Sequence, residues 1–249
     1  MKLAKSFGIE IVSLTDHDTT GGLKEAFDVA EDLGIELLPG VELSCDYMGE
    51  EVHVLGYYID FLNEELEEEL KWYQKKRIER IKIILDKLKD AGIEITMEDI
   101  VEFANGDSMG RMHVARAIIK HGYASDIREV FSRFLGENGI AYVPKPRLSI
   151  PDAVKFIKKF KGVPVLAHPG IYKKRSQIIT KSIKEGIEGI EVWYPEHSLE
   201  LTETLHEIAI KNDLVPTGGS DHHGKPRNLL GTITIEEKYV RMLAKRRPL

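Results

Sequence analysis

The sequence predicts an α/β fold, a β/α barrel interrupted by a mainly helical insertion. Short apolar, β-branched segments alternate with stretches of helical periodicity near both ends of the chain. Potential metal ligands recur where those apolar segments end, which is the position that α/β barrels use for their active sites. The length of 249 residues is enough for one such barrel with its own core.

The first sixty residues are expected to form a βαβ unit followed by a neighbouring strand. The expected strands are apolar, and the expected helix repeats apolar residues at helical spacing before a glycine suited to a C-cap. The strands cover 8–14, 35–42 and 51–59, and the helix covers 23–33 and ends at Gly34. The first strand runs into Asp16-His17-Asp18, the second ends at Glu42, and the third contains His53.

The same alternation returns in the last ninety residues, roughly a third of the chain. Strands are expected at 162–168, 186–194, 214–224 and 229–235, separated by helices at 175–186 and 198–212. The first of these strands ends at His168, and the third leads into Asp221-His222-His223. Both groups therefore lie at strand ends, like Asp16-His17-Asp18 and Glu42 of the first half.

The middle of the chain breaks the alternation. A charged helical run covers 63–89, and further helical stretches cover 97–105 and 113–120. We therefore expect residues 1–60 and 161–249 to form the barrel and residues 61–160 to form a mainly helical insertion. On the catalytic side of a barrel, such an insertion would act as a lid or a substrate wall.

Composition excludes several classes of protein. The single cysteine, Cys45, rules out disulfides within the chain and a thiolate metal cluster. A net charge of −6 argues against a broad basic surface for duplex nucleic acid but permits a local basic pocket. The sequence contains no long apolar run and no charged-then-apolar leader, which predicts a soluble, cytoplasmic protein without membrane contact.

Imidazole and carboxylate groups near strand ends, without thiolates, suit divalent Zn, Mn or Fe. Several such groups converging would hold a multinuclear centre, which supplies hydroxide at neutral pH and screens the charge of a phosphoryl group. Any one of these histidines alone is more simply explained as a satisfied core residue or an exposed one. Their joint recurrence at strand ends favours the metal centre.

Five short motifs, in this order, resemble those of the PHP (polymerase and histidinol phosphatase) family. They are Thr15-Asp-His-Asp-Thr19, Gly40-Val-Glu42, Val52-His53-Val-Leu-Gly56, Ala167-His-Pro-Gly170 and Gly219-Ser-Asp-His-His-Gly224. The resemblance implies a distorted seven-stranded, TIM-like β/α barrel that holds two or three metal ions and hydrolyses phosphoesters. It implies a ligand set with Glu42 bridging two metals, made of His17, Glu42, His53, His168, Asp221 and His223.

Further motifs resemble the branch of the family that acts on nucleoside 3′,5′-bisphosphates, 5′-nucleotides and short RNA 5′ ends. They are Gly110-Arg-Met-His113, Tyr142-Val-Pro-Lys145 and Trp193-Tyr-Pro-Glu-His197. This resemblance implies that Arg111 and Lys145 bind phosphate oxygens and that His197 donates a proton to the leaving oxygen. Thr19 is expected to add a hydroxyl contact. The alternative is that Arg111 and Lys145 are solvated surface charges.

The start of the chain departs from the family pattern, in which a first strand carries a His-x-His pair. The residues from Met1 onward resemble the helix that follows that strand, so the strand and its ligands are absent. Either the natural protein is longer, or the barrel lacks this strand. The first interpretation is favoured because a missing strand leaves unpaired strand edges. Without that strand, the chain is expected to hold its metal centre incompletely.

Together these observations predict a metal-dependent phosphoesterase that acts on a small phosphorylated substrate, a nucleotide or a short RNA end. Two other classes remain open. An amidohydrolase-like enzyme acting on a C–N bond also arranges His and Asp on a barrel. A truncated or degenerate, non-catalytic metal-binding protein would keep the ligands and lose turnover.

Overall fold

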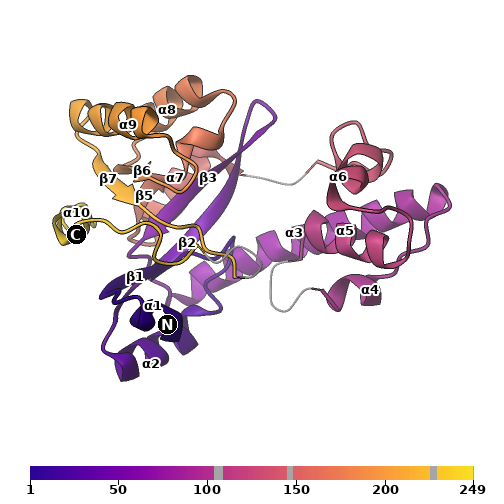
Figure 1. Cartoon of the computed structure of the whole chain (residues 1–249), viewed down its shortest axis with the longest axis horizontal. Helices are drawn as coiled ribbons and strands as arrows, with labels where there is room; N and C mark the ends of the chain where they lie inside the picture. The colour runs from indigo at the N-terminus through magenta and orange to yellow at the C-terminus, as the bar shows by residue number, and fades with distance from the viewer. Residues whose placement is uncertain (104–108, 145–147, 225–228, 249) are drawn as a thin grey trace. The chain divides into compact units, whose positions relative to one another are not determined.

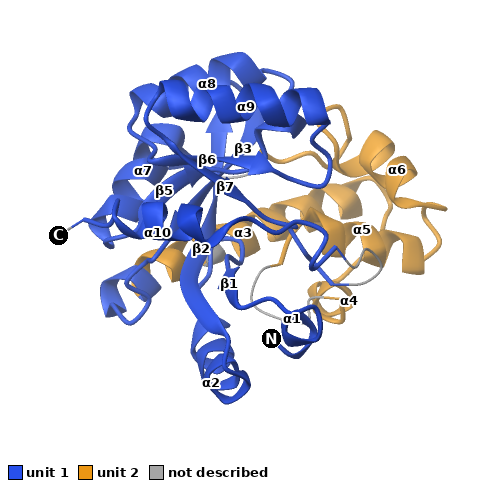
Figure 2. Ribbon diagram, turned by 60° about the vertical axis from the view of Figure 1, so that its left-hand side comes forward, with its two compact units in different colours: residues 1–67, 147–249 blue, residues 68–146 orange. Residues whose placement is uncertain are grey.

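A curled, seven-stranded sheet with the form of a half-barrel lies at the centre of the first of two units (Figure 1). The computed structural model describes residues 1–103, 109–144, 148–224 and 229–248. Unit 1 comprises Met1–Glu67 and Arg147–Leu249, and unit 2 comprises Glu68–Pro146 (Figure 2). The predicted α/β class is confirmed by the strands and helices of unit 1.

The sheet is mixed, and its strands follow the order β1-β2-β3-β5-β6-β7, with β4 paired to β2. The strands are β1 (Ile11–Leu14), β2 (Glu36–Tyr47), β3 (Glu50–Tyr57), β4 (Leu148–Ser149), β5 (Val163–Leu166), β6 (Gly189–Trp193) and β7 (Val215–Gly218). β1 pairs with β2 in parallel, as do β5 with β6 and β6 with β7. Parallel pairing requires a crossover connection, which the helices between these strands supply.

Strand β3 runs antiparallel to both of its neighbours, β2 and β5. The cause is the two-residue turn Met48-Gly49, whose φ angles of 52° and 84° suit a tight hairpin. Because the whole of β3 pairs with residues 40–47 of β2, β2 continues to Tyr47, five residues beyond its expected end at Glu42. The predicted strand–helix alternation is interrupted at this hairpin.

One face of the sheet, here called the site face, collects the polar residues. Residues paired in register point to the same face. The register joins Glu42 to Leu55, Leu55 to Val165 and Val165 to Gly189. His53 and Glu191 each lie two residues from a member of this row, so the two-residue period of a strand places them on the site face as well.

The opposite face is covered by α7 (Ile150–Lys159), which packs against β2, β3 and β5. Gly56 of β3 gives the helix room, because an added Cβ would lie 3.0 Å from the side chain of Ile157. Ser149 caps the helix by accepting a hydrogen bond from the amide of Asp152. The segment 61–160, expected as the insertion, thus includes a helix that belongs with the sheet of unit 1.

The other helices described in unit 1 connect or flank the strands. They are α1 (Lys2–Ser6), α2 (Leu23–Leu33), the 3₁₀ turn η2 (Pro169–Ile171), α8 (Arg175–Lys184), α9 (Leu199–Lys211) and α10 (Glu237–Ala244). Helices α8 and α9 lie side by side in both views (Figures 1 and 2). Helix α2 ends at Gly34 with a φ of 62°, which confirms the predicted C-cap.

The predicted last strand, residues 229–235, is wrong. The amide of Thr232 donates to the carbonyl of Leu229, and Gly231 has a φ of 81°, so this segment begins with a turn. A local turn bond and a left-handed residue interrupt extended backbone. Within the described residues, β7 is therefore the last strand of the sheet.

Unit 2 is helical where it is described. Its elements are α3 (Glu64–Asp90), which begins in unit 1, α4 (Met97–Val101), α5 (Arg111–Lys120), α6 (Ile127–Val130) and the π-helical turn η1 (Phe131–Leu135). Buried side chains of α3, including Ile81, Ile84 and Leu88, form one core with α5 and η1. No helix in the described part of the chain is long and apolar enough to cross a membrane.

Candidate metal centre

The loop after β1 places His17 beside Glu42. It continues alongside β2, because the amide of Glu42 donates to Asp16 O at 3.0 Å and the amide of Asp18 donates to Glu42 O at 2.9 Å. Asp18 adopts a left-handed φ of 52°, and its carboxylate accepts a hydrogen bond from the amide of Ser44 at 2.8 Å. These bonds hold the loop against β2, and His17 Nδ1 lies 3.7 Å from Glu42 Oε2.

His53 and His168 approach Glu42 from two other strands. His53, within β3, brings Nδ1 to 2.8 Å from Glu42 Oε1. His168, which follows β5, brings Nε2 to 3.2 Å from the same oxygen and to 3.1 Å from His53 Nδ1. Glu42 and His168 are both buried.

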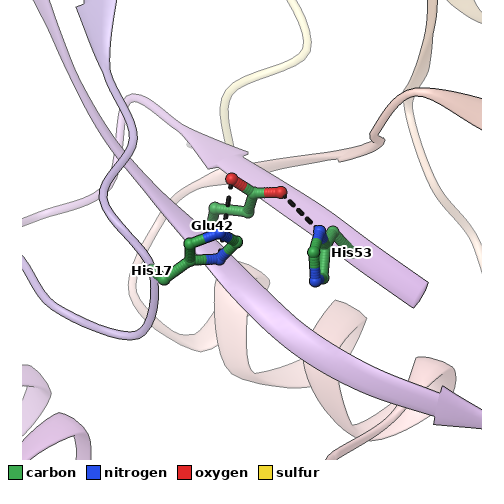
Figure 3. Close-up of side chains that lie close together, drawn as sticks. All are labelled: His17, Glu42 and His53. Atoms are coloured by element: carbon green, nitrogen blue, oxygen red, sulfur yellow. Dashed lines mark ion pairs between the residues drawn. The ribbon is translucent and has the colours of Figure 1, made fainter. Parts of the chain in front are cut away.

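The two oxygens of Glu42 therefore face different histidines. Oε2 points to His17 on one side and Oε1 to His53 on the other, as Figure 3 shows. Ligand atoms of these three residues all lie within 4.8 Å of one another. A carboxylate with an imidazole at each oxygen has the arrangement needed to bridge two ions.

The spacing of the donors fits a metal ion. Metal–ligand bonds of about 2.0–2.1 Å in tetrahedral geometry place neighbouring ligand atoms about 3.3 Å apart. The three distances among Glu42 Oε1, His53 Nδ1 and His168 Nε2 are 2.8, 3.2 and 3.1 Å. On the far side of its ring, His53 Nε2 lies 3.5 Å from Glu51 Oε1, a carboxylate able to orient a ligating imidazole.

Burial and mutual charge shift the titration of this cluster in the absence of metal. Burial pushes the pKa of Glu42 up, but the charges of His53 and His17 and hydrogen bonds from His168 and His53 bring that pKa well below its usual value. Burial lowers the pKa of His53, but Glu42 outweighs it and raises that pKa to about 9. Without metal, protons on imidazole therefore balance the buried carboxylate.

Asp221 and His223 form a second group beside the first. His223 Nε2 lies 2.8 Å from Asp221 Oδ1, and the His223 ring stacks on His17 with centroids 5.8 Å apart. The hydroxyl of Tyr194 donates to Asp221 Oδ2 at 3.0 Å. The hydrogen bond with His223 lowers the pKa of Asp221 and raises the pKa of His223. The structure thus gathers the six residues expected as ligands into two adjoining groups.

His197 has both ring nitrogens in use. Its Nε2 accepts a hydrogen bond from the amide of Gly170 at 3.0 Å, so the proton must be on Nδ1, which donates to Val192 O at 2.9 Å. Burial lowers the pKa of this histidine. To protonate a leaving group, as expected from the sequence, His197 would first have to release Gly170.

Replacing Gly170 with alanine is expected to lower the free energy of unfolding by about 1–3 kcal/mol, the usual cost of overpacking. An added Cβ would lie 2.6 Å from His197 Nε2 and 2.8 Å from the side chain of Leu201. Urea denaturation measures the effect. In a His197→Ala background the same substitution should cost less, and an equal cost in both backgrounds would contradict the steric explanation.

The other expected site residues are placed differently. Arg111, at the first position of α5 in unit 2, donates to Leu135 O at 3.1 Å and lies over the ring of Phe131. Thr19 is buried, and its Oγ1 accepts from the amide of Gly21 within a local turn. Lys145 lies outside the described residues.

Two buried residues near the centre were not among the expected site residues. Glu191 accepts a hydrogen bond from the amide of His168, and its pKa is raised to about 8, mainly by burial and further by Glu42 and Asp221. Tyr172 bonds to the backbone of His53. A sequence signal existed only for Glu191, an acid among apolar residues in a strand; Tyr172 follows from the path of the chain after His168.

Comparison with known proteins found clear relatives, although no family model matches the chain. It is 35% identical to a 3′,5′-nucleoside bisphosphate phosphatase of Chromobacterium violaceum, over 86% of this chain and 76% of that protein. It is 31% identical to a 5′-3′ exoribonuclease of Haemophilus influenzae, over 87% of this chain and 80% of that protein. A phosphoribosyl 1,2-cyclic phosphate 1,2-diphosphodiesterase of Eggerthella lenta is also 31% identical, over 90% and 87%.

Two solved structures also resemble this chain over most of its length. A protein of Bifidobacterium adolescentis described as a metal-dependent phosphoesterase superposes with a TM-score of 0.84 at 29% identity, covering 99% of this chain and 89% of that one. A Chromobacterium violaceum protein described as an amidohydrolase, with bound sulfate and no metal, superposes with a TM-score of 0.80 at 32% identity, covering 91% and 81%.

Proposed function

Since the chain belongs to the PHP family and is a metal-dependent phosphoesterase, we propose that it removes phosphate from a nucleotide, a nucleoside 3′,5′-bisphosphate or a short RNA end. The observation that carries this proposal is the buried carboxylate of Glu42, faced by histidines from three separate segments of the chain. The relatives that act on nucleoside bisphosphates and RNA supply the substrate class.

We propose that two or three divalent ions bind at this centre. Oxygen Oε1 of Glu42 would serve one ion with His53 and His168, and Oε2 would serve another with His17. Asp221 and His223 complete the proposed set. Bound ions would activate water and screen the charge on the phosphoryl oxygens. Imidazole and carboxylate donors accept Mn, Zn or Fe, so the donor set is compatible with all three.

The remaining roles concern the substrate. We propose that Arg111 and Lys145 bind phosphate oxygens, because a guanidinium and an ammonium form charge-assisted hydrogen bonds with them. His197 is proposed to act near the leaving oxygen after its bond to Gly170 opens. Thr19 is proposed as a further contact once its hydroxyl turns from the amide of Gly21.

An amidohydrolase activity is the second candidate. It is favoured by the resemblance to the Chromobacterium violaceum structure described as an amidohydrolase. Cyclic amides that contain no phosphate discriminate the two activities, because a phosphatase has no use for them as substrates.

The proposal predicts inorganic phosphate release from adenosine 3′,5′-bisphosphate with added Mn²⁺, and its loss when a chelator removes the metal. Phosphate is measured colorimetrically, with and without re-added Mn²⁺. Turnover of a cyclic amide without phosphate release would favour the amidohydrolase. Metal binding with no turnover of either substrate class, including a short 5′-phosphorylated RNA, would favour a non-catalytic metal-binding protein.

A further inference from the structure

The backbones of His53 and His168 meet at one hydroxyl group. Tyr172 accepts a hydrogen bond from the amide of His53 at 2.9 Å and donates one to the carbonyl of Ala167 at 3.0 Å. The amide of Ala167 in turn donates to the carbonyl of His53 at 3.1 Å. The Tyr172 hydroxyl therefore links strand β3, which carries His53, to Ala167, which precedes His168.

The path of the chain brings Tyr172 to this position. After His168 the chain makes the turn η2 and curls back, so that the Tyr172 ring lies 5.6 Å from the His168 ring, between centroids. Tyr172 is buried, with 6% of its surface exposed, so water cannot readily replace its hydroxyl in these bonds.

Glu191 forms a second hydrogen bond to the backbone at His168. Its Oε2 accepts a hydrogen bond from the amide of His168 at 2.7 Å. His168 has φ 25° and ψ 58°, a sparsely populated conformation that costs about 1–3 kcal/mol unless its surroundings impose it. Gly219 allows Glu191 this position, because an added Cβ at that residue would lie 2.9 Å from Glu191 Oε1.

We propose that Tyr172 and Glu191 are positioning residues of the metal centre, which hold the backbones of His53 and His168 so that both imidazoles face Glu42 Oε1. The proposal rests on the proposed metal site. The bonds through which Tyr172 and Glu191 act run to the backbone, so their effect on the reaction passes through the two histidines. Loss of either residue therefore weakens metal binding.

Two substitutions test the positioning role. Tyr172→Phe removes one hydroxyl and keeps the ring, and Glu191→Ala removes the acceptor of the His168 amide. Both are expected to weaken Mn²⁺ binding, measured by titration calorimetry with the metal alone, by about 10–100-fold, as loss of groups that orient ligands does. Phosphate release should recover at saturating Mn²⁺, and Glu191→Gln, which keeps an acceptor oxygen, should restore affinity close to the parent.

Matched controls are Tyr239→Phe, another buried tyrosine, and Glu188→Gln, which precedes β6 and pairs with Lys158. The proposal is overturned if Tyr172→Phe binds Mn²⁺ as tightly as the Tyr239→Phe control. If Glu191→Ala fails to fold, Tyr172→Phe still decides the outcome. Glu42→Gln tests the metal site separately from the positioning role, because unchanged Mn²⁺ binding in this variant would overturn the metal site itself.

Discussion

Replacing Glu42 with glutamine is expected to lower Mn²⁺-dependent phosphate release by at least about 100-fold. This is the upper end of the loss seen when a residue that only orients a metal ligand is removed. Glu42 is a proposed ligand itself, and its two oxygens face His17 and His53. The amide of glutamine presents one oxygen and one NH₂ group, so it leaves one of the two sides without an acceptor. Among the described residues, Glu42 is the carboxylate that forms a possible metal-ligand group with these two histidines.

The measurement is initial rate against Mn²⁺ concentration, with bound metal determined on the same preparation. Glu36→Gln is the matched control, because it neutralises an exposed acid at the far end of the same strand, β2. Equal activity in Glu42→Gln and Glu36→Gln would contradict the assignment. A selective loss together with lower metal content would support it.

The second large effect is on pH dependence. In protein freed of metal by a chelator, the free energy of unfolding is expected to fall as the pH rises from about 6.5 to about 9. Although burial lowers the pKa of His53, Glu42 raises it from 6.5 to about 9 in the folded state. A raised histidine pKa contributes stability that is complete below 6.5 and lost as the pH passes 9. The upper limit of this loss is about 3 kcal/mol.

Two further groups act in the same direction. The pKa of His223 is raised by its hydrogen bond with Asp221. Burial raises the pKa of Glu191 from 4.5 to about 8, so its favourable neutral form is also lost as the pH rises. Urea denaturation at about pH 6 and about pH 9.5, on either side of this window, measures the sum of these effects. Stability that is constant or rises across the window would contradict the expectation, and Glu42→Gln should reduce the fall.

The affinity for metal is expected to change with pH in the opposite direction to the stability of the metal-free protein. Ligation requires neutral imidazole, so Mn²⁺ must displace the proton that Glu42 holds on His53. Apparent Mn²⁺ affinity is therefore expected to increase as the pH rises toward 9, while metal-free stability decreases. Calorimetric titrations in buffers of different ionisation enthalpy count the released protons, and the absence of proton release at pH 7 would contradict this linkage.

The sequence predicted the strands that carry the centre but not how they are joined. Apolar runs ending in polar residues identified the segments before Glu42 and His168, because a buried strand must exclude charge until it reaches the edge of the core, and an apolar run identified the strand that contains His53. The antiparallel direction of β3 depended on the turn Met48-Gly49, where a methionine with positive φ gives no clear sequence signal. Helix α7 was not predicted, because it lies in the segment 61–160, where the break in strand–helix alternation suggested only a helical insertion.

The residues of the candidate site were also only partly predictable from the sequence. His17, Glu42, His53 and His168 could be named from their motifs, because their side chains are the groups that converge. The contributions of Tyr172 and Glu191 run through hydrogen bonds to backbone atoms. Such contacts depend on which strands become neighbours. The sequence marks Glu191 only as an acid among apolar strand residues and does not mark Tyr172 at all.

The β2–β3 hairpin also affects the order in which the proposed ligands come together during folding. His17, Glu42 and His53 are brought together by neighbouring segments, whereas His168 bonds to His53 across a separation of 115 residues. Local contacts form early and distant ones late. During synthesis His17 emerges first, the hairpin follows with Glu42 and His53, and His168 appears only after all of unit 2 has been made. Tight loading with metal is therefore expected to follow the pairing of β5 with β3, as a late step of folding.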